Sequence, residues 1–221
     1  MDMHRCVGIG GIPHPGICPG DFNIQCCSSS FDPATNNSTS TPNNNHLMLT
    51  DLADILRSAG LTVIEVEGWK TRGHGGMISV KSILIHHTAG PVNDDFPSLR
   101  IVRDGRTDLS GPLSQLGLGR TGTWYVIAAG RSYHAGKTID DSLFGNYNAI
   151  GIEAEGTGIP STNSGHAYWP EVQYQSYVRG VQALQVFYNI PTERVLGHKE
   201  AAIPSGRKPD PNFSMDEFRN A

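Results

Sequence analysis

Two short stretches carry residue types that suit metal chemistry. Near the C-terminus, residues 197–200 read GHKE and residues 206–211 read GRKPDP, so a histidine, a lysine and an aspartate lie among glycines and prolines. A neutral imidazole and a carboxylate are good zinc ligands, and a nearby lysine stabilises developing negative charge. Far upstream, residues 82–88 read SILIHHT, an apolar run that ends in histidine. Together these stretches offer the three protein ligands of a catalytic zinc site, which leaves a fourth position open for water.

The elements around these stretches must hold them rigidly. The apolar run before His86 predicts a buried central strand that delivers His86 and His87 at its end. Successive strand side chains point to opposite faces of a sheet, so only one of this pair points into a given site. Residues 149–156 read AIGIEAEG and predict a second strand. Its alternation places Glu153 and Glu155 on one face, where both could approach the metal.

Signals for helices and strands alternate along the rest of the chain. Residues 46–59 have apolar side chains at helical spacing, and Gly60 follows them. The longest predicted helix begins at Pro170 and ends before Pro191. Further predicted elements are a strand at 61–66, a short helix at 96–102, strands at 113–119 and 123–129, and a closing helix at 216–219.

A small cysteine-rich segment precedes this domain. Four thiols fall within the first 27 residues, with Gly and Pro between them: Cys6, Cys18, Cys26 and Cys27. This clustering predicts a loop module stapled by disulfide bonds. A structural zinc is the alternative, although the adjacent pair is a poor match to C-x-x-C spacing. Residues 28–45 are dominated by Ser, Thr, Asn and Pro, which predicts a linker. We therefore divide the chain into a cysteine-rich segment with its linker (residues 1–45) and a main domain (residues 46–221).

The motifs ILIHHTAG, NAIGIEAEGTG, VLGHKE and GRKPDP resemble those of the zinc-dependent N-acetylmuramoyl-L-alanine amidases, in the type-2 amidase and peptidoglycan-recognition-protein superfamily. Within that group, DLADILRSAGLTVIEVEGWKTRGHGG and LGLGRTGTWYVIAAGRSYHAG resemble the amidase domains of endolysins from phages of actinobacteria. The resemblance runs from about residue 47 to residue 218. It implies an α/β fold in which a single mixed central β-sheet is flanked by helices, here with a small N-terminal cysteine-rich extension. It also implies an antimicrobial, wall-degrading hydrolase that cuts the amide bond between N-acetylmuramic acid and the L-alanine of the stem peptide.

The resemblance assigns roles to individual residues. Zinc is expected on His86, His198 and Asp210, and Lys208 is expected to stabilise the oxyanion. His134, in the motif RSYHAG, is expected beside the cleft in contact with substrate. His87 either supports a ligand or packs under the sheet, and we group it with His134 among the substrate-binding candidates.

The residue expected to act as general base differs from that of many superfamily members. Many members carry a catalytic tyrosine at the position that corresponds to Ser114 here. Glu153 is therefore the expected base, and Glu155 is expected to be either solvated or a loop anchor. Between His198 and Lys208 the chain is also about two residues longer than is common in the family, which a loop absorbs at little cost in free energy.

Composition limits the partners. A net charge of −4 gives no electrostatic reason to expect nucleic acid or an anionic membrane. No apolar stretch approaches the roughly 20 residues of a membrane span. We expect a monomer whose partner is bacterial peptidoglycan, acting outside the cell or at the bacterial cell wall. The N-terminus lacks the apolar core of a secretory signal, so the export route is not visible in the sequence.

Two other functions are compatible with the resemblance. Some peptidoglycan-recognition proteins lose metal ligands and bind wall fragments without cutting them. All five residues expected to bind zinc or act in catalysis are present here, which favours an enzyme. A cytosolic recycling amidase acting on soluble anhydro-muropeptides is the second alternative, and the N-terminal cysteines argue against it.

Overall fold

The computed structural model describes residues 11–14, 26–29, 46–161 and 165–221. The chain divides into two compact units, residues 1–43 and 44–221. In the first unit, β1 (Gly11–His14) pairs antiparallel with β2 (Cys26–Ser29). Cys6 and Cys18 lie outside the described residues, and only the backbone of Cys26 and Cys27 is described, so the predicted disulfides are not tested. They stay predictions, as does the division at residue 45 into separate domains.

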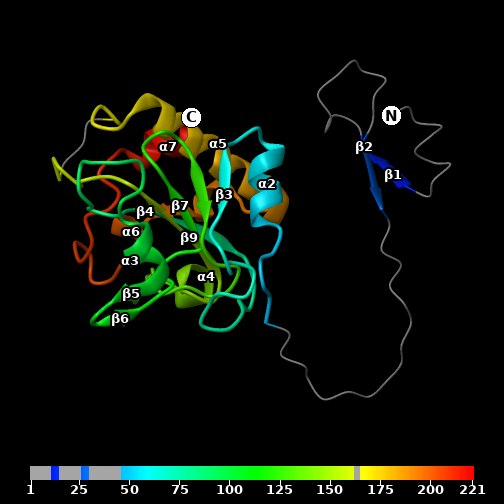
Figure 1. The fold of residues 1–221 in the computed structure, drawn as a ribbon, viewed down its shortest axis with the longest axis horizontal. Coiled ribbons are helices and arrows are strands. Elements are labelled where there is room, and N and C mark those ends of the chain that lie inside the picture. The colour runs from blue at the N-terminus through cyan, green and yellow to red at the C-terminus, as the bar shows by residue number, and fades with distance from the viewer. Residues whose placement is uncertain (1–10, 15–25, 30–45, 162–164) are drawn as a thin grey trace. The chain divides into compact units, whose positions relative to one another are not determined.

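A six-stranded mixed sheet with the order β10-β4-β9-β7-β8-β3 forms the centre of the second unit (Figure 1). Only β7 and β8 run antiparallel, and the other neighbouring pairs are parallel. This confirms the predicted α/β fold with one mixed central sheet. The strands are β3 (Val63–Glu65), β4 (Ser82–His87), β7 (Leu116–Leu118), β8 (Trp124–Val126), β9 (Ala149–Ala154) and β10 (Val195–Gly197).

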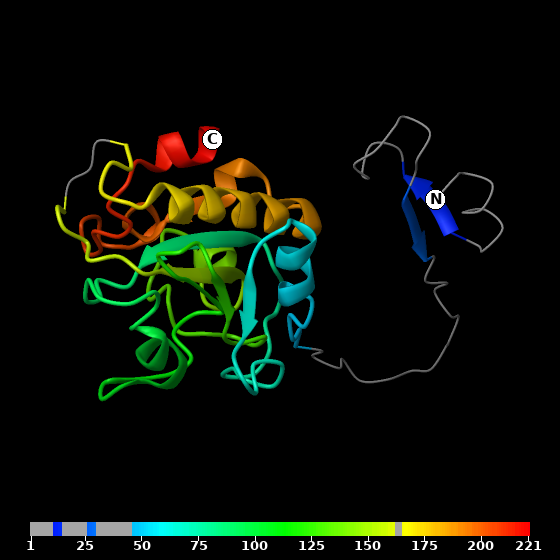
Figure 2. The same ribbon diagram turned by 45° about the horizontal axis from the view of Figure 1, so that its top comes forward.

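Helices cover the sheet, with the long helix α5 (Glu171–Tyr188) and α7 (Met215–Asn220) on one side (Figure 2). On the other side lie α3 (Leu99–Asp104) and the hairpin of β5 (Gly105–Arg106) and β6 (Leu109–Ser110). None of the described helices combines the length and apolar character that crossing a bilayer requires. The remaining elements are α2 (Leu52–Ser58), α4 (Asp141–Phe144), α6 (His198–Ala201) and the 3₁₀ turn η1 (Thr192–Arg194).

The helix predicted at 96–102 begins later, at Leu99. Its N-cap residue, Ser98, does not cap the helix with its side chain, because the hydroxyl donates to Glu155 instead. The Ser98 side chain therefore makes a tertiary contact in place of the local cap that a serine at this position often provides.

Helix α5 holds the strands that lead to the predicted site. Gly180 lets the helix approach the sheet closely, since a Cβ there would lie 2.1 Å from the Trp124 ring. One turn earlier, the fully buried Tyr177 hydroxyl accepts from the backbone N–H of His86 (3.3 Å) and donates to the carbonyl of Ile152 (2.9 Å). A single side chain thus joins α5 to β4 and β9 where the metal-binding residues are expected.

Replacing Tyr177 by Phe removes this link while keeping the ring. We expect the free energy of unfolding, measured by urea denaturation, to fall by about 1–3 kcal/mol, because buried strand groups lose a partner. Tyr174 is a matched control: it lies on the same helix and is equally buried, but its hydroxyl has no hydrogen-bond partner among the described residues. Tyr174→Phe should leave stability unchanged or raise it. Equal losses in both variants would contradict this account of Tyr177.

Candidate active site

Neighbouring parallel strands bring two histidines to one edge of the sheet. Strands β4 and β10 run side by side with Gly197 opposite Ile85, so His198 follows β10 at the level where β4 reaches His86. Parallel strands end at the same edge, and sites in such sheets gather there. Both side chains are buried, with 1% of His86 and 3% of His198 exposed.

The chain after His198 folds back to bring Asp210 to the same place. The backbone N–H of Lys199 donates to the carbonyl of Asp210 (2.7 Å), and the Lys199 ammonium donates to the carbonyl of Phe213 (2.7 Å). The lysine of the GHKE motif, Lys199, therefore anchors the returning segment, whereas Lys208 lines the cleft.

Three ligand atoms converge at this edge. Asp210 Oδ2 lies 3.0 Å from His86 Nδ1 and 3.1 Å from His198 Nδ1, and the three atoms lie within 4.8 Å of one another. The ring of His198 also shows which nitrogen is free. Its Nε2 lies 3.0 Å from the carbonyl of Ala135, which only accepts, so with a metal ion in the site Nε2 would carry the proton and Nδ1 would present its lone pair. Two imidazoles and a carboxylate in this arrangement fit a zinc ion.

The electrostatics of the three groups suit a metal. Burial lowers the pKa of His86 to about 4, so the ring is neutral near pH 7. Burial alone would raise the pKa of Asp210, but contacts with His198 and His86 outweigh it and hold that pKa well below its usual range. The site therefore offers a neutral imidazole and an ionised carboxylate, the forms that bind metals.

Glu153 lies opposite His86 on the neighbouring strand β9 and lines the same cleft. Its Oε2 atom is buried and has no hydrogen-bond partner in the described part of the chain. Burial, followed by the charge of Asp210, raises the pKa of Glu153 to about 8, while Lys208 opposes the shift. A carboxyl group of raised proton affinity beside a metal site is suited to accept a proton.

Glu155 has a different role, although it is only two residues away. It is 1% exposed and accepts from the Thr88 hydroxyl (2.7 Å), the Ser98 hydroxyl (3.0 Å) and the Ser98 backbone N–H (3.0 Å). It anchors two loops, as one of the expectations had it, and the solvated alternative is wrong. Strand β9 ends at Ala154, so the alternation that predicted a shared face does not extend to Glu155.

The roles predicted for His87, His134 and Ser114 remain predictions. The structure does show where each of these side chains lies. His87 and His134 both line the cleft. His87 Nδ1 accepts from the backbone N–H of Asn212 (3.2 Å), and His134 Nδ1 lies 3.2 Å from His86 Nε2. Ser114 is fully buried and donates to the carbonyl of Leu116 (2.7 Å), so its hydroxyl is committed inside the protein.

Part of the cleft lining was missed by sequence reasoning. Besides the predicted residues, the cleft is lined by Arg106, Leu109, Leu113 and Tyr133. The Tyr133 ring is held by stacking on His74, with ring centroids 3.7 Å apart and planes 7° apart. Tyr133 directly precedes His134 in the RSYHAG motif. Its position next to a predicted cleft residue could have identified it as a further candidate.

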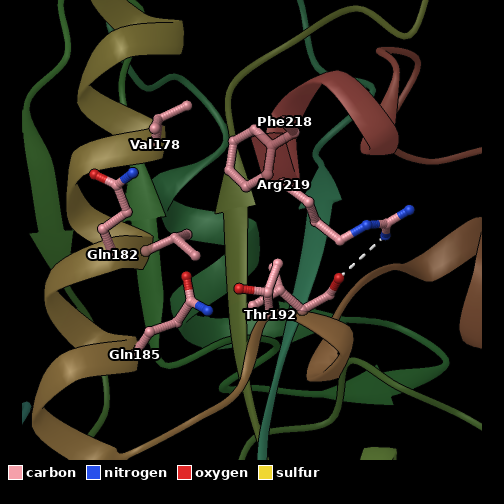
Figure 3. A pocket seen from close by; sticks show the side chains of 8 residues that line it. Val178, Gln182, Gln185, Thr192, Phe218 and Arg219 are labelled. Atoms are coloured by element: carbon pink, nitrogen blue, oxygen red, sulfur yellow. Dashed lines mark hydrogen bonds between the residues drawn. The ribbon is translucent and has the colours of Figure 1, made fainter. Parts of the chain in front are cut away.

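A second hollow lies between α5, η1 and α7 (Figure 3). It opens beside Val195 at the start of β10, whereas His198 follows the end of that strand. Arg219, the charged residue in its wall, donates to the carbonyl of Val195 and to Glu200. This hollow shares no described lining residue with the cleft, and we assign it no chemistry.

A sequence model of a known family, described as N-acetylmuramoyl-L-alanine amidase, matches residues 76–213. The match covers more than half of the chain and includes every candidate ligand and catalytic residue. This chain belongs to the N-acetylmuramoyl-L-alanine amidase family. Zinc dependence and a link to phages of actinobacteria stay predictions.

Solved structures agree with the fold of this family member. A mutant endolysin from Bacillus subtilis has a TM-score of 0.52 and 19% identity, covering 72% of this chain and 97% of that chain. AMPDH3 from Pseudomonas aeruginosa has a TM-score of 0.51 and 20% identity, and the match covers 71% of this chain and 65% of that chain. The catalytic domain of XlyA has a TM-score of 0.50 and 21% identity, and the match covers 72% of this chain and 98% of that chain. No curated protein sequence matches the chain.

The two glutamates should respond oppositely to the same substitution. Glu155→Gln leaves Ser98 and Thr88 facing a neutral amide, so we expect the free energy of unfolding to fall by about 1–3 kcal/mol. Glu153→Gln replaces a buried carboxyl group, whose Oε2 has no described partner, with an amide that cannot ionise, and should leave the stability of the metal-free protein unchanged or raise it. Urea denaturation of both variants without metal makes the comparison. A large loss of stability in Glu153→Gln would show that Glu153 is structural.

Proposed function

We propose that this protein is a zinc-dependent peptidoglycan amidase that hydrolyses the amide bond between N-acetylmuramic acid and the L-alanine of the stem peptide. One observation carries the proposal: His86, His198 and Asp210 converge in a cleft that Glu153 and Lys208 also line. Membership of the amidase family supports the choice of bond. We further propose a monomer that acts on bacterial peptidoglycan at the cell wall, with neither a nucleic acid nor a membrane as its partner.

Zinc is the cofactor that this ligand set would hold. When bound, it supplies Lewis-acid chemistry that polarises water and the carbonyl oxygen of an amide. His86 and His198 would each contribute Nδ1, and Asp210 would contribute Oδ2, the atoms that already face one another. Three protein ligands leave one position open, as a catalytic site needs.

Protons and charge would be handled by the other cleft residues. Glu153 would accept a proton from the attacking water and later deliver it to the leaving nitrogen. Lys208 would place its positive charge near the oxyanion that forms at the lactyl carbonyl, where losing one such donor typically costs on the order of a hundred- to thousandfold in rate. His87 and His134 remain candidates for substrate contact because both line the cleft.

Zinc content, measured beside the release of new L-alanine amino termini from cell walls, tests the proposal. The purified protein should contain one zinc per chain. Glu153→Gln should keep zinc and lose at least ~100-fold in turnover, since an amide cannot accept the proton. Lys208→Ala should also keep zinc and mainly lower the rate constant. Asp210→Ala should lose the metal itself.

Three outcomes would contradict this function in different ways. Turnover by a metal-free protein would remove zinc from the mechanism. Near wild-type turnover in Glu153→Gln would remove the proposed base. A metal-free protein that binds walls without cutting them would instead be a recognition module.

Reducing agent should leave turnover largely intact. All four cysteines lie within the first 27 residues, whereas the first residue of the proposed site is His86. The measurement is amide cleavage with and without a thiol reductant that does not strip zinc, with metal content followed in parallel. Loss of turnover at unchanged zinc content would mean that the cysteine-rich segment belongs to the active domain.

A further inference from the structure

Two consecutive residues face the two metal-site histidines from the side away from Asp210. His134 Nδ1 lies 3.2 Å from His86 Nε2, and the carbonyl of Ala135 lies 3.0 Å from His198 Nε2. Each zinc-site imidazole therefore has its second nitrogen occupied by the same short segment. In each ring the opposite nitrogen, Nδ1, is the one that faces Asp210.

A proton count fixes which way these bonds run. A neutral imidazole carries one N–H and one lone pair. His134 Nε2 lies 3.2 Å from the carbonyl of Ala149, which only accepts, so Nε2 carries the proton of that ring. His134 Nδ1 is then an acceptor, and His86 must donate to it from Nε2. This leaves the Nδ1 lone pair of His86 directed toward Asp210. The Ala135 carbonyl has the same effect on His198, because it accepts from Nε2 and leaves the Nδ1 lone pair facing Asp210.

The segment is itself held in place by contacts outside the cleft. The side-chain oxygen of Asn146 accepts from the backbone N–H groups of both His134 (3.0 Å) and Ala135 (2.9 Å). Asn146 is not among the residues that line the cleft. Gly151 of β9 makes room for the ring, because a Cβ there would lie 2.5 Å from His134 Cγ.

We propose that residues 134–135, clamped by Asn146, form a positioning unit that fixes the tautomer and ring orientation of both metal-binding histidines. The proposal rests on the zinc site of the proposed function and gives His134 a role besides substrate contact. Second partners of this kind commonly set the affinity of a metal site. The unit acts through His86 and His198, so its members are positioning residues.

Asn146 offers the cleanest test, because it touches neither the metal ligands nor the cleft. Zinc affinity of the full chain is measured by competition with a chelator, together with thermal unfolding of the zinc-free protein. Asn146→Leu should weaken zinc binding by about 10–100-fold, the usual cost of losing an outer partner. Asn146→Asp keeps an oxygen acceptor and should bind zinc nearly as wild type does. If Asn146→Leu binds zinc as tightly as wild type, or if Asn146→Asp is as weak as Asn146→Leu, the proposal is wrong.

A second variant tests the imidazole itself. His134→Leu should weaken zinc binding by a similar factor of about 10–100. His74→Leu is the control, since His74 is a half-buried ring that stacks on Tyr133 and contacts neither metal-binding histidine. It should leave zinc affinity unchanged. Equal affinities in wild type and His134→Leu, or equal losses in the two variants, would overturn the assignment.

Nitrogen-15 NMR of the zinc-loaded wild-type protein decides the matter without any variant. His134 should carry its proton on Nε2, with a bare Nδ1 bonded to the N–H of His86. A proton on His134 Nδ1 would overturn the proposal even if every variant failed to fold. If the wild-type protein binds no zinc, this inference and the proposed function fall together. If it binds zinc and cuts walls while the variants keep full affinity, this inference alone fails.

Discussion

The Nδ1 lone pairs of His86 and His198 lie 3.0 Å and 3.1 Å from one carboxylate oxygen of Asp210, and all three side chains are buried. Such groups repel unless a positive charge lies among them, and burying them uncompensated is costly. Most of the domain can be understood as meeting this constraint. Parallel strands place the histidines, a returning loop places Asp210, and the long helix prevents the strands from separating.

Environment, more than sequence position, separates the roles of similar residues. Glu153 and Glu155 are two positions apart, yet Glu153 has a buried oxygen without a partner among the described residues, beside the candidate metal ligands, whereas Glu155 is hydrogen-bonded between two loops. Tyr174 and Tyr177 differ in the same way on one helix. A partnered polar group supports the scaffold, whereas an unpartnered one beside a cleft remains available for chemistry.

Much of this could be predicted from the sequence, and the limit has a physical cause. The apolar run before His86 and the GHKE and GRKPDP motifs identified the strand and all three candidate ligands. The sequence left open whether Glu155 is solvated or anchors a loop, because the answer depends on its bonds to Ser98, 57 positions away. Tyr133 and Asn146 escaped notice for the same reason. Their partners are set by how loops pack, which local periodicity does not encode.

The returning loop after His198 has a consequence for how the chain can vary. The Lys199 N–H bonds directly to the Asp210 carbonyl, and residues 201–203 are bonded to residues 137–139, so the chain between these anchors runs out and back through the exposed residues 204–207. The spacing of the ligands in space is thereby uncoupled from the number of residues between them. A change of length at this turn would leave the bond between Lys199 and Asp210 in place. For protein engineers, the exposed tip near Ser205 and Gly206 is a natural place to graft a peptide tag or fluorophore.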